Sequence, residues 1–227
     1  NKNARHLRSD MNIALNNTAD IAQIWTEQEY FVLEQQTGLR HEFVNGKVSA
    51  MVGGSFNHAR LVSTFSRLIG NHLDGHPCEV FAESTKIKVP AHRNNNNYCY
   101  PDVVVDCNVQ DATDNILTTP ILLIEVISNS SHRHDKLTKR NLYEQIPSLQ
   151  EYVTVEQNSV EINIRRRRTG WQIEQFFLGD DVTFESIHLT VHVESLYQRV
   201  DNEEMLLWLA EKAQQAKDTQ DTPKQDD

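Results

Sequence analysis

The stretch Ile-Leu-Leu-Ile-Glu-Val-Ile at residues 121–127 decides the fold of this chain. Apart from Glu125 it is continuously apolar, which is typical of a central β-strand covered on both faces. Residues 98–106, which include Pro101-Asp102, have a similar β-branched and aromatic character and predict a neighbouring central strand. A carboxylate in the middle of such a strand is costly to desolvate unless a cation meets it. The sequence therefore predicts a charged partner for Glu125.

Helical and alternating patterns flank these two strands. Spacing of apolar residues and capping signals predict helices that begin at Thr26 and end near Gln36, and that cover 57–74, 134–145 and 201–217. Asn45-Gly46 predicts a β-hairpin joining 40–44 to 47–51. Further strands are predicted at 78–82, 85–89, 151–156, 160–166 and 171–178, the last two joined at Thr169-Gly170. This order predicts an α/β protein.

Length and composition predict one soluble domain over residues 21–200. We expect a disordered leader at 1–20, a C-terminal amphipathic helix at 201–217 and a disordered tail at 218–227. No apolar run approaches the ~20 residues needed to cross a bilayer, so no membrane association is predicted. Cys78, Cys99 and Cys107 are odd in number and lack CxxC spacing, so neither a disulfide nor a zinc site is predicted, and a cytoplasmic location is expected.

The formal net charge of −10 bears on possible partners. The last ten residues contribute −3 of it, through four Asp and one Lys, so the rest of the chain carries −7. Nucleic-acid binders usually present a basic field, because neutralising phosphates drives their affinity. The composition therefore counts against tight, autonomous binding to DNA. Arg165–Arg168 is a conspicuous basic run, which either touches phosphates or protects an edge strand from pairing.

Asp102 and Glu125 are candidate metal ligands. Because side chains alternate along a strand, Asp102 shares a face with Val104, and Glu125 shares a face with Leu123. If the two strands are adjacent, both carboxylates meet, and Mg²⁺ or Mn²⁺ would relieve their repulsion, with the Val126 carbonyl as a further ligand. The alternatives are that Asp102 begins a strand through an Asx-type turn and that Glu125 forms a structural ion pair.

These residues resemble a known nuclease pattern. Pro101-Asp102 with Glu125-Val126-Ile127 is similar to the PD-(D/E)xK signature, and residues from about Tyr30 to Val193 resemble the Uma2 family of restriction endonucleases, abundant in cyanobacteria. The matching positions are Glu42 to Gly46 (ExxxG), His58, Pro101-Asp102, Glu125 to Ser128, Asp135-Lys139-Tyr143 (DxxxKxxxY), Pro147 and Glu151-Tyr152. The resemblance implies a restriction-endonuclease-like mixed β-sheet core (αβββαβ) flanked by helices, with an added N-terminal helix and hairpin and a C-terminal β-meander plus helix.

The resemblance also assigns roles to site residues. Ile127 stands where the signature has lysine, and Lys139 in the following helix matches the lysine that orients or deprotonates the attacking water. Lys136 and Arg140 are alternatives for that role. Glu42 is implied as a third carboxylate, His58 either holds Glu42 or meets a substrate phosphate, and Tyr143 is either a site neighbour or ordinary packing.

Three functions are compatible with these patterns. The first is a Mg²⁺- or Mn²⁺-dependent endonuclease hydrolysing phosphodiester bonds of DNA. The second is a catalytically silent binding or regulatory module with the same fold, favoured by the acidic body and by Met205, Leu206, Trp208 and Leu209, a candidate homodimer seam. The third is a nuclease for RNA or a nucleotide.

Overall fold

The structure is a computed structural model that describes residues 24–51, 53–91, 96–109, 115–127 and 133–220. Its helices are α2 (Glu27–Thr37), α3 (Phe56–His72), α4 (Arg133–Tyr143), α5 (Val193–Tyr197) and α6 (Glu203–Gln220). The strands of the N-terminal half are β1 (His41–Val44), β2 (Lys47–Ala50), β3 (Glu79–Ala82), β4 (Lys86–Val89), β5 (Asn97–Cys99) and β6 (Val103–Asp106). The remaining strands are β7 (Ile116–Leu117), β8 (Pro120–Ile127), β9 (Glu151–Glu156), β10 (Ile162–Arg166), β11 (Ile173–Phe176), β12 (Asp181–Phe184) and β13 (Leu189–His192).

A six-stranded mixed sheet forms the centre of the molecule. Its strand order is β11-β10-β9-β8-β6-β3, with β8 and β9 parallel and the other neighbours antiparallel. The elements α3, β3, β6, β8, α4 and β9 follow one another in the predicted αβββαβ order, with β4, β5 and β7 diverted into a second sheet. The predicted mixed α/β core is therefore confirmed.

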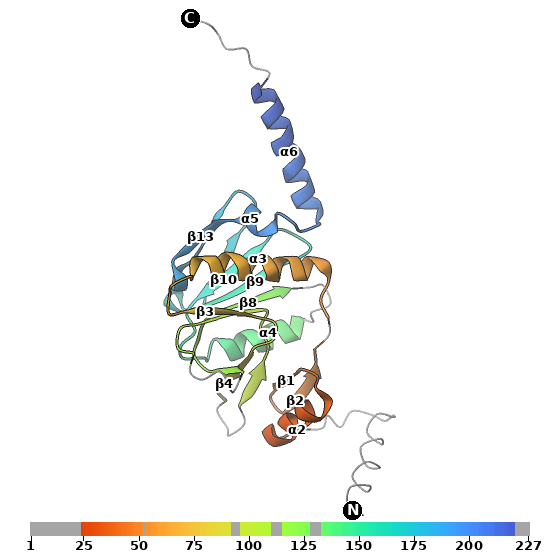
Figure 1. The fold of residues 1–227 in the computed structure, drawn as a ribbon, viewed down its shortest axis with the longest axis vertical. Coiled ribbons are helices and arrows are strands. Elements are labelled where there is room, and N and C mark those ends of the chain that lie inside the picture. Colours follow the sequence, from red (N-terminus) through yellow and green to blue (C-terminus); the bar gives the residue numbers. More distant parts are fainter. Residues whose placement is uncertain (1–23, 52, 92–95, 110–114, 128–132, 221–227) are drawn as a thin grey trace, which may run out of the picture.

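The two faces of this sheet are covered by different helices (Figure 1). On one face, alternate residues of β6, β8 and β9 pack against Leu61, Phe65 and Ile69 of α3. On the other face, Val104, Leu123 and Tyr152 pack with residues that belong to α4 or follow it, among them Leu142 and Tyr143. Glu125 lies between Ile124 and Val126, which both face α3, so its side chain points to the α4 side.

The second sheet has the order β2-β1-β5-β4-β7 and carries the N-terminal elements. Thr26 caps α2 through a capping box with Glu29, as the sequence predicts for the start of that helix. Tyr30, Phe43 and Tyr98 form a small aromatic core between α2 and this sheet.

The predicted continuous strand 98–106 is wrong. It is divided into β5 in the second sheet and β6 in the central sheet, separated by Tyr100, Pro101 and Asp102. Pro101 cannot donate a backbone hydrogen bond, which favours a break in a ladder at this point. As a result Asp102 lies in a bend that immediately precedes β6, not within a strand.

The prediction that the chain contains no disulfide is also wrong, because Cys78 and Cys107 form one. Glu79 pairs with Asp106 in the β3–β6 ladder, so the two cysteines occupy the next opposing positions. A separation of 29 residues carries no signal of this, since the pairing exists only once the ladder forms. Cys99 is a free, buried thiol.

The C-terminal part contains elements that the sequence patterns did not predict. These are the β12–β13 hairpin and the short helix α5. Helix α6 extends away from the body (Figure 1) and runs to Gln220, three residues beyond the predicted end. Disorder was predicted for residues 1–20 and 218–227. Residues 218–220 belong instead to α6, and residues 1–20 and 221–227 lie outside the described residues. No helix in the described part of the chain combines the length and apolarity that spanning a membrane requires.

The packing of α3 against the central sheet generates a stability prediction. Phe65 is fully buried and meets Phe184 edge-on at 6.0 Å between ring centroids, whereas Phe56 on the same helix is 85% exposed. Phe65→Ala should lower the free energy of unfolding by about 3–5 kcal/mol. Phe56→Ala is the matched control and should change it by less than ~0.5 kcal/mol. Urea denaturation of both variants measures this, and equal losses would contradict the described packing.

Candidate functional site

Asp102 lies where the central sheet meets the second sheet. The β6–β8 ladder pairs Val103 with Ile124, so the next opposing positions are Asp102 and Glu125. The Val126 backbone N–H donates to Asp102 Oδ2 at 2.6 Å, which fixes this carboxylate beside the end of β8. The predicted adjacency of the two strands is therefore observed. Val126 contacts Asp102 through its N–H group, whereas the sequence predicts a role for its carbonyl as a metal ligand.

Glu125 is the buried acid of the site. It lies in β8, flanked on both sides by strands, and Tyr143 donates its hydroxyl hydrogen to Glu125 Oε1 at 2.7 Å. Burial raises the pKa of Glu125 to about 7; Lys139 opposes this rise, and the charges of Asp102 and Glu42 add to it. Glu125 is therefore an acid whose ionisation depends on the cations around it.

Lys139 of α4 lies between two carboxylates. Its Nζ is 2.9 Å from Glu42 Oε1 and 3.4 Å from Glu125 Oε1. Burial alone would lower the pKa of Lys139, but the charges of Glu125 and Glu42 outweigh burial and hold this pKa well above its ordinary value. The amine is consequently a cation, suited to orienting a water molecule or stabilising negative charge rather than to removing a proton.

Glu42 reaches the site from β1 of the second sheet. Its Oε1 accepts hydrogen bonds from Lys139 and from the Tyr100 backbone N–H at 3.3 Å. Because β1 pairs with β5, Glu42 is brought to α4. The site is thus assembled from both sheets.

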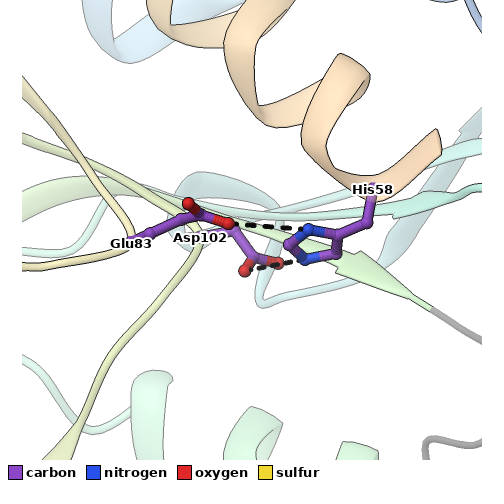
Figure 2. Close-up of side chains that lie close together, drawn as sticks. All are labelled: His58, Glu83 and Asp102. Carbon is purple, nitrogen blue, oxygen red and sulfur yellow. Dashed lines mark hydrogen bonds and ion pairs between the residues drawn. The ribbon is translucent and has the colours of Figure 1, made fainter. Parts of the chain in front are cut away.

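His58 extends from α3 towards Asp102 (Figure 2). It lies in the first turn of α3, which Ser55 caps, and its Nε2 is 3.0 Å from Asp102 Oδ1. Its Nδ1 is 3.6 Å from Glu83 Oε1. The hydrogen bond to Asp102 raises the pKa of His58; burial opposes this, and the charges of Asp102, Glu83 and Glu125 reinforce it. Its described partners are Asp102 and Glu83, so the predicted contact with Glu42 is not formed.

One described group of side chains offers ligand atoms close enough for a metal ion. His58, Glu83 and Asp102 each provide one such atom, and these atoms lie within 4.8 Å of one another. Sequence reasoning missed Glu83, which follows β3 with φ 45° and donates its backbone N–H to the Asp102 carbonyl at 3.0 Å. No motif marks Glu83, because its position depends on the β3–β6 pairing.

The other predicted cations have separate contacts. Arg140, an alternative to Lys139, donates from Nε to Glu144 at 2.6 Å. The Lys136 side chain lies outside the described part of the chain. Tyr143 is fully buried against Tyr152 and also hydrogen-bonds Glu125, so its packing and site roles coexist.

Comparison with known proteins connects this geometry to a family. The model of the Uma2 family, described as "Putative restriction endonuclease", matches residues 27–192. The chain belongs to the Uma2 family. The family prediction made from the spaced residues is therefore confirmed, and with it the assignment to a restriction-endonuclease-like class.

Relatives of this Uma2 chain come from cyanobacteria. The uncharacterized protein slr1290 of Synechocystis sp. is 35% identical over 174 residues, covering 75% of this chain and 90% of the relative. The uncharacterized protein sll1609 of the same organism is 34% identical over 138 residues, covering 60% and 76%. A crystal structure of a "putative nuclease belonging to DUF820" from Anabaena variabilis has a TM-score of 0.57 at 18% identity, covering 71% and 92%. This last likeness supports the fold.

The pKa of Glu125 predicts how the stability of this Uma2 protein depends on pH without metal. Its folded value of about 7 exceeds the ordinary 4.5, so the folded protein binds this proton more tightly than the unfolded chain. The resulting stabilisation is complete below 4.5 and is lost as the pH rises to about 7. Glu125→Gln should abolish this component.

Melting temperatures across that interval in a chelator-containing buffer measure the effect. The wild-type melting temperature should fall relative to that of Glu125→Gln as the pH rises. Glu79→Gln, at an exposed glutamate of β3, is the control and should follow the wild type. Parallel curves for wild type and Glu125→Gln would contradict the raised pKa.

Proposed function

We propose that this protein is a divalent-metal-dependent endonuclease that hydrolyses phosphodiester bonds of DNA. The observation that carries the proposal is the position of Lys139, whose amine lies within 3.4 Å of both Glu42 and Glu125. Asp102 occupies the position opposite Glu125. A purely structural ion pair would need only one acid beside Lys139. Two acids at the lysine, and a third joined to Val126, leave an excess of negative charge that suits a metal ion.

The side chains present fit a hard divalent cation. Asp102, directly before β6, and Glu125 in β8 would hold the ion from opposing positions, with the Val126 carbonyl as the backbone ligand. His58 and Glu83 add donors on the other side of Asp102. Carboxylate oxygens suit Mg²⁺ and Mn²⁺, and an imidazole nitrogen is better tolerated by Mn²⁺. Such an ion would supply Lewis-acid polarisation of the scissile phosphate.

The protein's own residues have distinct roles in this proposal. Lys139, held as a cation by its two acids, orients the attacking water and stabilises the charge that develops on the phosphate. Tyr143 is a positioning residue, because it holds Glu125 through a hydrogen bond of 2.7 Å. In the absence of metal, His58 holds Asp102 through a hydrogen bond of 3.0 Å. Glu42 holds the amine of Lys139.

Loss of the Lys139 charge tests the catalytic part of the proposal. Lys139→Ala should reduce Mg²⁺- or Mn²⁺-dependent nicking of supercoiled plasmid by at least ~100-fold, since loss of one group that stabilises transition-state charge costs about that much. Lys212→Ala, at an exposed lysine of α6, is the matched control and should retain wild-type activity. Initial rates of nicking measure both, and an active Lys139→Ala enzyme would remove the proposed role.

Metal binding is tested by thermal stability, independently of activity. At a Mn²⁺ concentration of about 100 times Kd, the wild type should gain about 2.7 kcal/mol, seen as a higher melting temperature. Asp102→Asn should lose this gain. Asp74→Asn, at an exposed acid beyond the opposite end of α3 from His58, should keep it. Absence of any Mn²⁺- or Mg²⁺-linked rise at millimolar concentration would end the metalloenzyme proposal.

The alternative of a non-catalytic interaction module rests on the exposed side of α6. Leu206, Leu207 and Leu209 are 57%, 59% and 46% exposed, whereas Met205 is buried and Trp208 packs against the core. A protein acting only through such a surface would show no metal-linked stabilisation. The thermal experiment therefore separates the two functions.

A further inference from the structure

The basic run Arg165–Arg168 divides into residues with different environments. The buried Arg166 donates to Glu151 and Glu174, and Arg168 pairs with Glu185. Arg167 donates to the backbone carbonyls of Leu149 and Ile146. These three arginines stabilise the end of β10. Arg165 differs from them, because neither a carboxylate nor a backbone carbonyl among the described residues binds its Nε.

Arg165 carries a guanidinium group that the described residues do not neutralise. Its Nε is buried and has no hydrogen-bond partner among them, while the residue as a whole is half-buried and accessible from one side. A buried N–H group without an acceptor costs about 1–3 kcal/mol, so such a group calls for an explanation.

A second guanidinium lies near Arg165. Burial lowers the pKa of Arg165, and the charge of Arg140 lowers it further. Glu144, which acts in the opposite direction, is already hydrogen-bonded to Arg140. Glu144 is thus the carboxylate that acts on both guanidinium groups, which leaves a net positive charge that an anion would balance.

The register of the central sheet connects this pair to the candidate site. Arg165 is opposite Tyr152, which packs on the α4 face against Tyr143. Tyr152 in turn is opposite Leu123, two residues from Glu125 on the same face of β8. Arg140 belongs to α4, the helix that covers this face of the sheet. Both arginines therefore lie on the face of the sheet that carries Glu125 and Lys139.

We propose that Arg165 and Arg140 bind a backbone phosphate of the DNA strand, next to the phosphate that is cleaved. This inference rests on the proposed function and adds a substrate contact to it. Guanidinium groups bind phosphate oxygens through paired N–H donors, and the phosphate would meet the accessible part of the half-buried Arg165 side chain rather than its buried Nε. Such a contact also explains how an acidic protein retains a strand beside its carboxylates: the attraction is confined to the site.

The test measures DNA binding as a function of salt. Binding of the full-length protein to a fluorescent double-stranded oligonucleotide is followed by anisotropy, with Ca²⁺ in place of Mg²⁺ and NaCl varied. Arg165→Gln should raise Kd about tenfold at low salt, as loss of a charged hydrogen bond does. It should also reduce the slope of log K against log[salt] by about 1, equally for duplexes of different sequence.

Matched variants make the outcome specific. Arg168→Gln removes an arginine of the same run that is paired with Glu185, and it should leave Kd and slope unchanged. Arg140→Gln should reproduce the change in slope, which keeps the proposal testable if Arg165→Gln fails to fold. Wild-type Kd and slope in both Arg165→Gln and Arg140→Gln would overturn this inference and leave the nuclease proposal standing. A wild type that does not bind DNA would overturn both.

Discussion

The carboxylate of Glu125 lies in the middle of a strand with neighbours on both sides, and the arrangement of the site follows from the need to compensate its charge. An isolated carboxylate in this environment would take up a proton. Helix α4 supplies the compensation: Lys139 provides a cation and Tyr143 a hydroxyl donor, one helical turn apart. The same region of chain buries Leu142 and Ile146 against the sheet. Core packing and electrostatic compensation therefore position the same helix.

The junction of the two sheets determines which groups can meet there. Pro101 separates β5 from β6, so the chain passes from the second sheet into the central sheet directly before Asp102. Glu42 and the Tyr100 backbone come from the second sheet, while Asp102 and Glu125 come from the central one. Because both sheets pack into one shared hydrophobic core on the α4 side, the acids are held close together despite their repulsion. Stored repulsion of this kind is relieved when a cation binds.

The molecule as a whole is acidic, whereas several cations lie near its candidate site. The chain has a net charge of −10, which repels nucleic acid at long range. Lys139 and the pair Arg140 and Arg165 lie on one face of the central sheet, near the acids that would hold a metal. In the proposed nuclease, DNA association would depend on these local contacts and on the metal ion. It also separates the structural arginines 166 to 168 from those available to a substrate.

The sequence by itself determined the central strand at residues 121–127, the helices that flank it and the family, because apolar periodicity and a set of spaced residues are local properties of the chain. It also determined that Asp102, Glu125, Lys139 and Glu42 belong to one pattern, although only the family resemblance joined Glu42 and Lys139 to the acids. Tertiary structure alone decided that β5 and β6 are separate strands, that Cys78 meets Cys107, that Glu83 joins His58 and Asp102, and that Arg165 differs from its three neighbours. Each of these depends on strand register and on contacts between distant segments, which no local pattern specifies.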